Sequence, residues 1–111
     1  ILEINEEDIF SENTIKLFDN HIKFENLKLN KSKHFIGIRP EHLKTNLKTN
    51  FTFKPEIELI ENLGNEKIVY MKKNKHQLSA KIPSNIDVLD SIGFDLENLF
   101  IFDNYGKRVR F

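Results

Sequence analysis

The sequence contains no cysteine and no tryptophan, and only four glycines and three prolines among its 111 residues. Without cysteine there is no disulfide framework and no thiolate, so thiol catalysis is excluded and a reducing cytosol is permitted. No apolar run approaches the roughly 20 residues that a membrane-spanning helix needs, and no charged and then apolar signal segment opens the chain. These absences predict a segment that is soluble as it stands.

Net charge is also absent. Seventeen basic residues balance seventeen acidic ones, so the chain has no overall field that would attract a polyanion, although local patches remain. Lys107, Arg108 and Arg110 alternate with apolar residues near the end of the chain, which is compatible with a nucleic-acid strip or with an ordinary terminal strand. The balanced total charge favours the strand and disfavours a nucleic-acid partner.

The length fits one domain, which would bury roughly two-thirds of the surface that the unfolded chain exposes. We therefore expect a single module over residues 1–111, or two intertwined halves over 1–50 and 51–111. Ten phenylalanines supply most of the aromatic content, and burying each contributes on the order of 1.5 to 3 kcal/mol. The numbering begins at Ile1 rather than at a methionine, which indicates a segment of a longer polypeptide or a processed product.

Alternation of apolar and polar residues predicts short strands throughout. A hairpin is expected from 14–18 and 21–24, with a turn at Asp19-Asn20 and with Ile15, Leu17, Ile22 and Phe24 facing inward. The clearest alternation has apolar residues at 51, 53, 55, 57 and 59, and Pro55 predicts an edge position or a bulge because it has no N–H to donate. Further strands are predicted at 1–4, 35–38, 67–71, 77–82, 99–102 and 107–111. Evenly spaced short strands without a long helix indicate an all-β barrel or sandwich.

The most specific stretch is Phe35–Leu43. Strand 35–38 points Ile36 and Ile38 inward while Gly37 leaves room for a neighbour. Pro40 then ends the strand and favours a helical turn, after which Leu43 packs back. Arg39 and Glu41 are expected to hold this turn as an ion pair or cap, or else to lie at an interface.

Three strings in this order resemble one family. Gly37–His42 reads GIRPEH, Glu61–Tyr70 fits E-x-L-G-x-E-x-x-V-Y, and Leu99–Val109 resembles a closing L-x-L-F-D-x-x-T-G-x-R-I. These strings are similar to motifs in the C-terminal accessory domain, called TOBE, of the ATP-binding subunit of ABC importers of the maltose, glycerol-3-phosphate and multiple-sugar type. The resemblance covers 35–111 well and 1–33 loosely. It favours a strand ending at Phe94 where the residues alone also allow a helical turn through Ile86, Leu89 and Ile92.

This resemblance implies an OB-like barrel with one or two short helical turns that serves as a non-catalytic regulatory or dimerisation domain. It implies a homodimer through the same domain, membrane permease subunits as partners of the parent protein, and a regulatory protein in some members. The location would be cytoplasmic, at the inner face of the membrane. The residues implied as structural or interface candidates are Gly37, Arg39, Pro40, Glu41, His42, Glu61, Leu63, Gly64, Glu66, Phe102, Asp103, Gly106 and Arg108.

No motif for chemistry accompanies these strings. The P-loop pattern G-x-x-x-x-G-K-[ST] is missing, since Gly106-Lys107 is followed by Arg108. We therefore expect no enzyme and no cofactor here, and the resemblance implies that ATP and Mg bind to an ATPase domain upstream. The four histidines lack zinc-ligand spacing and are predicted at the surface or in turns. The carboxylates of Glu56, Glu58 and Glu61 are predicted to be solvated.

Two other functions remain open. The first is a TOBE module that senses an oxyanion or a sugar, with lysine loops at 44–50 and 72–75 as donors. The second is a free-standing OB module that binds oligonucleotides, a frequent use of this barrel.

Overall fold

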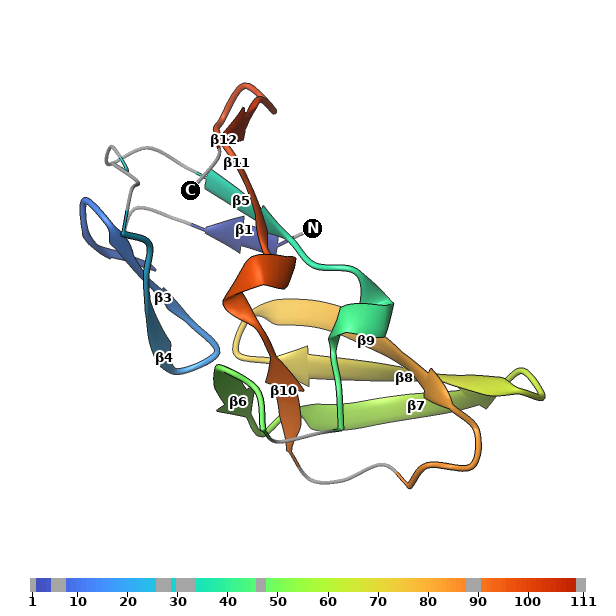
Figure 1. Cartoon of the computed structure of the whole chain (residues 1–111). Helices are drawn as coiled ribbons and strands as arrows, with labels where there is room; N and C mark the ends of the chain where they lie inside the picture. The colour runs from blue at the N-terminus through green and yellow to red at the C-terminus, as the bar shows by residue number, and fades with distance from the viewer. Residues whose placement is uncertain are drawn as a thin grey trace. The chain divides into compact units, whose positions relative to one another are not determined.

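The computed structural model describes residues 2–4, 8–25, 29, 34–45, 48–87 and 91–109 (Figure 1). Its elements are short strands and two 3-10 turns, which confirms the all-β prediction. The strands are β1 Leu2–Ile4, β2 Ile9–Ser11, β3 Thr14–Leu17, β4 Asn20–Lys23, β5 His34–Gly37, β6 Phe51–Phe53, β7 Glu56–Asn62, β8 Glu66–Lys73, β9 His76–Pro83, β10 Ile92–Phe94, β11 Phe100–Phe102 and β12 Arg108–Val109. The turns are η2 Pro40–His42 and η3 Leu96–Asn98.

The chain divides into two compact units, one formed by Ile1–Gly37 with Leu99–Phe111 and the other by Ile38–Asn98. In this division both ends of the chain belong to the first unit, and the middle of the chain forms the second. The two halves considered above, 1–50 and 51–111, divide the chain differently. Each unit holds short antiparallel sheets, an arrangement consistent with an OB-like fold. Among the described residues the strands form four separate sheets, so closure into a barrel stays a prediction.

The first unit contains the sheets β1-β5-β11-β12 and β2-β3-β4. The hairpin β3–β4 buries all four residues predicted to face inward, because directly opposite positions such as Ile15 and Ile22 share a face. The turn, however, lies one residue earlier than predicted. Phe18 and Asp19 both have positive φ, at 51° and 65°, and Asn20 already pairs with Leu17. Such a two-residue loop matches the right-handed twist of its strands.

The second unit contains the sheets β7-β8-β9 and β10-β6. Phe94 of β10 stacks on Phe51 at 5.4 Å between ring centroids and meets Phe53 edge-on at 6.0 Å, so an aromatic cluster fills this part of the core. Residues 92–94 form a strand, as the resemblance favoured, whereas 88–90 lie outside the described residues.

The predicted strand over 51–59 is wrong as one element. It splits at Lys54-Pro55 into β6 and β7, because proline has no N–H for the ladder. The expectation of an edge or bulge near Pro55 is confirmed, since β7 is the outer strand of its sheet and its register shifts between Ile57 and Leu59.

Several other boundaries differ from the predictions. The loop predicted at 72–75 is only Asn74-Lys75, because Lys72 and Lys73 extend β8. The closing strand predicted at 107–111 is described as Arg108–Val109, and 110–111 lie outside the described residues. Two histidines predicted at the surface or in turns are buried instead, His34 and His76.

Candidate functional site

The strings that carry the family resemblance lie on three turns. Gly37–His42 joins the end of β5 to η2, Glu61–Tyr70 forms the turn and most of strand β8 in the hairpin β7–β8, and Leu99–Val109 forms the hairpin β11–β12. The first and third are brought together because β5 and β11 are paired, with Gly37 opposite Phe100 and Phe35 opposite Phe102. The contact involves Gly37 alone, because the rest of the first string, 38–42, and the whole second string belong to the other compact unit.

Gly37 has the role expected from the sequence. A Cβ at this position would lie 3.3 Å from Cε2 of Phe102 and 3.7 Å from Cβ of Phe100. The first distance is shorter than ordinary carbon contact, so a side chain here would displace the ring of Phe102. The glycine therefore allows two strings of the resemblance to pack closely.

Pro40 begins the turn η2, where its fixed φ suits the first helical position. The N–H of His42 donates to the carbonyl of Arg39 at 2.9 Å, and the N–H of Leu43 donates to the carbonyl of Pro40 at 3.3 Å. Leu43 is buried, as predicted. The side chain of Arg39 makes no capping hydrogen bond to this turn, whereas an ion pair with Glu41 or a position at an interface stays a prediction.

The β7–β8 turn is held by its own polar groups. Gly64 has a φ of +100°, and its N–H donates to Oδ1 of Asn62 at 3.0 Å. The N–H of Leu63 donates to the carbonyl of Glu66 at 2.8 Å, and the carboxylate of Glu66 lies 3.5 Å from Nζ of Lys81. Glu61, Leu63, Gly64 and Glu66 are exposed, so the turn presents them to solvent.

The β11–β12 turn depends on Asp103. Its Oδ1 accepts hydrogen bonds from the N–H groups of Tyr105 at 2.9 Å and Lys107 at 2.8 Å. Gly106 has a φ of +81°, the left-handed region that a tight reversal needs. The guanidinium of Arg108 lies 4.7 Å from the ring centroid of Phe100, a cation–π contact on the same sheet.

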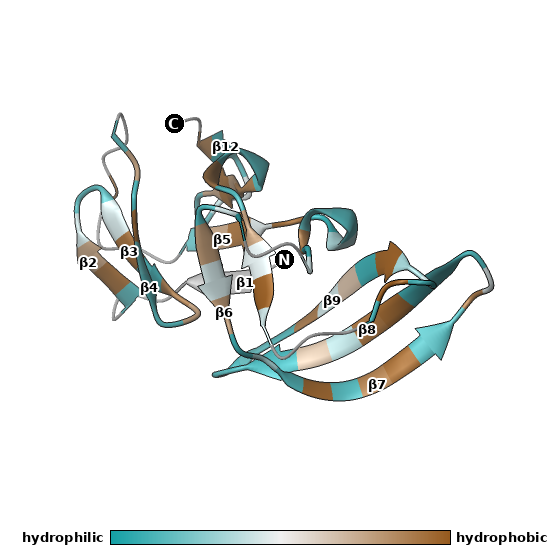
Figure 2. Cartoon of the chain, turned by 60° about the horizontal axis from the view of Figure 1, so that its bottom comes forward, coloured by the Kyte–Doolittle hydropathy of each residue, from teal (hydrophilic) through white to brown (hydrophobic). Residues whose placement is uncertain are grey.

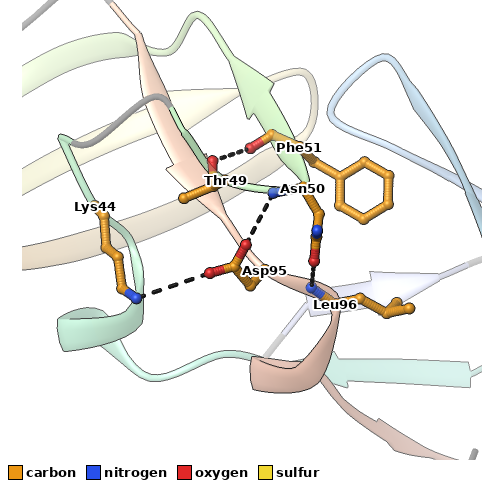
Figure 3. Close-up of polar contacts among 6 residues, drawn as sticks. All are labelled: Lys44, Thr49, Asn50, Phe51, Asp95 and Leu96. Atoms are coloured by element: carbon orange, nitrogen blue, oxygen red, sulfur yellow. Dashed lines mark hydrogen bonds and ion pairs between the residues drawn. The ribbon is translucent and has the colours of Figure 1, made fainter.

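A polar cluster in the second unit was not predicted (Figure 3). The N–H of Asn50 donates to Oδ1 of Asp95 at 2.8 Å, and Oδ1 of Asn50 accepts from the N–H of Leu96 at 2.9 Å. Nζ of Lys44 lies 3.8 Å from Oδ2 of Asp95. The contacts of Asn50, Asp95 and Lys44 join the segment before β6 to the segment after β10. The backbone of Lys44 also forms an antiparallel bridge with Gly93.

The hairpin β7–β8 also carries the densest group of exposed apolar side chains. Ile57, Leu59, Ile60 and Leu63 are 38%, 59%, 46% and 55% exposed, and Tyr70 is 37% exposed. Figure 2 shows apolar and polar segments alternating along β7. The sequence predicts a strand with apolar residues at 57 and 59, and the exposure of both side chains marks a candidate interaction surface.

Nothing gathered at these places indicates catalysis or metal binding. No group of three or more His, Cys, Asp or Glu side chains comes together within the part of the chain that the structure describes. His42 is half-buried in η2, and Nδ1 of its ring has no hydrogen-bond partner. None of the helices in the described ranges is long and apolar enough to cross a membrane.

The fold thus defines a small all-β domain of short antiparallel sheets. No model of a known protein family matches the chain. Over 81 residues it is 33% identical to the sn-glycerol-3-phosphate import ATP-binding protein UgpC of Vibrio cholerae serotype O1. The matched region is 66% of this chain and 22% of that protein, so the chain spans about a fifth of the length of the curated relative that it matches. This similarity supports a domain related to the ATP-binding subunits of importers.

Proposed function

We propose that this chain is a TOBE-type, OB-like accessory domain in the ATP-binding subunit of an ABC importer, and that it regulates or dimerises the subunit without catalysing a reaction. One observation carries the proposal: three strings of the family resemblance, in order, lie on the β5–η2 junction, the β7–β8 turn and the β11–β12 turn of an all-β chain. The similarity to part of an import ATP-binding protein supports the same role.

Such a domain acts mechanically. Two ATPase subunits that open and close must stay together, which requires a rigid domain and a self-complementary surface on each copy. The hydrogen bonds of Asp103 and the close contact at Gly37 support the first requirement, because they define the β11–β12 turn and its pairing with β5. The proposal also includes a homodimer through this domain, which supplies the second.

The remaining parts of the proposal concern the parent subunit. ATP and Mg²⁺ bind to its ATPase domain, and the subunit associates with membrane permease components at the cytoplasmic face. The solute is a sugar or glycerol phosphate, in keeping with the name of the relative, an sn-glycerol-3-phosphate import protein. A regulatory protein is a further partner.

Four experiments test the proposal. The coding sequence upstream of Ile1 should contain a P-loop and an ABC signature, and a chain preceded by neither would contradict the assignment to a transporter subunit. Sedimentation velocity of the 111-residue chain should show self-association at high micromolar concentration, and a strict monomer there would count against the homodimer. Turnover of ATP by the chain alone would contradict the non-catalytic role, and tight oligonucleotide binding at low salt would favour the alternative OB module.

A further inference from the structure

The outer edge of β7 is an unpaired strand edge with unusual side chains. In the sheet order β7-β8-β9, β8 pairs with β7 on one side only, and no described strand lies on the other side. The opposite edge of this sheet is different, because η2 packs against β9. We infer that the edge of β7 binds an extended segment of another protein, one that alternates basic and apolar residues, by adding it to the sheet as a strand.

The backbone of β7 suits this addition. The strand has seven residues and no proline between Glu56 and Asn62, so the residues that do not bond to β8 can direct their N–H and C=O groups to the outer edge, on both sides of the register shift between Ile57 and Leu59. At about 3.3 Å per residue it offers roughly 23 Å of edge. Strand addition takes its affinity from main-chain hydrogen bonds and its selectivity from alternate side chains.

The side chains of β7 favour an apolar partner. All seven residues are exposed, and three of them are Ile57, Leu59 and Ile60. Leu59 lies directly opposite Tyr70, which extends the apolar surface onto β8. Soluble proteins normally keep long apolar edge strands short, charged or covered, because such edges pair with other chains. The exposed side chains of β7 therefore either prevent pairing with strands of other proteins or favour pairing with one kind of strand.

Charge distinguishes these two cases. Glu56, Glu58 and Glu61 make no ion pair within the described residues, and no basic residue lies in β7. Three carboxylates on seven residues repel acidic segments and attract basic ones. The three carboxylates therefore disfavour pairing with acidic segments and favour pairing with a basic segment.

A second copy of β7 is the competing occupant. In an antiparallel pair that overlaps all seven residues, Leu59 meets Leu59, Glu58 meets Ile60 and Ile57 meets Glu61, so no carboxylate of β7 gains a basic partner. A segment that alternates basic and apolar residues supplies those opposite charges, which favours it over a second copy. The inference depends on the geometry of β7 and is independent of the function proposed above.

The test uses the full 111-residue chain, labelled with ¹⁵N, and a capped heptapeptide in which Lys and Val alternate. Adding the peptide should shift amide signals of residues 56–62 most strongly. A Glu–Val peptide of equal length and a Lys–Val peptide with a central proline are the controls, and neither should produce these shifts. Binding should weaken as salt is raised, because exposed charges are screened.

Protein variants test the role of charge. The double variant Glu58→Lys/Glu61→Lys should weaken binding of the Lys–Val peptide about tenfold. Glu97→Lys, a charge reversal at another exposed glutamate, on η3, should change it less than about twofold. If the double variant fails to fold, the signal shifts of the unmodified chain still decide the outcome.

Three results would overturn the inference. The first is no binding of the Lys–Val peptide at millimolar concentration. The second is equal binding of all three peptides, or shifts that map outside 56–62. The third is concentration-dependent broadening of the 56–62 signals without peptide, which would make a second copy the occupant.

Discussion

Replacing Asp95 by alanine is expected to destabilise the second unit through lost hydrogen bonding rather than lost charge pairing. The carboxylate performs two tasks: Oδ1 accepts from the N–H of Asn50 at 2.8 Å, and Oδ2 lies 3.8 Å from Nζ of Lys44. The side chains of Lys44 and Asp95 are 43% and 23% exposed, so water and salt screen their attraction.

The hydrogen bond and the ion pair of Asp95 should contribute different free energies. A hydrogen bond to a charged acceptor contributes about 1.5 to 3 kcal/mol, which the partial exposure of Asp95 reduces to about 1 to 2 kcal/mol. An exposed ion pair contributes about 0 to 1 kcal/mol. Asp95→Ala should therefore lower the free energy of unfolding by about 1.5 kcal/mol, or about 6 °C in Tm for a chain of this length. Asn50→Ala should cost about 1 kcal/mol, because the N–H of Leu96 loses its acceptor.

Urea denaturation of Asp95→Ala, Asn50→Ala and Lys44→Ala provides the comparison. Lys44→Ala should cost less than about 0.5 kcal/mol, since the backbone bridge from Lys44 to Gly93 remains. Faster amide exchange in β10 would place the Asp95→Ala effect in this unit. If Lys44→Ala costs as much as Asp95→Ala, or if 1 M salt abolishes the difference between Asp95→Ala and the parent chain, the reasoning is refuted.

Three further substitutions test other parts of the structure. Gly37→Val should cost about 1 to 3 kcal/mol through its clash with the ring of Phe102, and Phe102→Ala in the same chain should recover part of that loss in thermal unfolding. Phe24→Ala should cost about 3 to 5 kcal/mol because Phe24 is fully buried, whereas Phe10→Ala, at a site 72% exposed, should stay within about 0.5 kcal/mol in the same assay. Gly64→Ala should cost about 1 kcal/mol, since φ is +100° there, and an increase in urea midpoint would contradict this.

Local alternation predicted the elements whose partners are near in sequence. Ile22 and Phe24 lie where the hairpin pattern placed them, because each inward position repeats every second residue. The same rule would have located the buried histidines: His34 shares a face with Ile36, and His76 with Ala80. Residue type and spacing predict surface positions for these histidines, whereas the strand period decides their burial.

The features that the sequence did not predict depend on residues far apart in the sequence, or on whether another part of a protein covers a strand. Asn50 and Asp95 are 45 positions apart, so neither residue indicates the other before the fold brings them together. The alternation at Ile57 and Leu59 predicts a strand, which the structure confirms, but no pattern within β7 shows whether another layer covers it. Phe18 lies in the turn with a positive φ, at a position where Asn or Gly is the usual residue.

The pairing of Gly37 with Phe100 has a consequence for biosynthesis. In the sequence, the whole second unit, Ile38–Asn98, lies between these two paired residues. On the ribosome, β1 and β5 emerge before the second unit, and their sheet is complete only when β11 has followed it. The second unit can form its own sheets in that interval, so we expect them to form before the sheet of the first unit is complete.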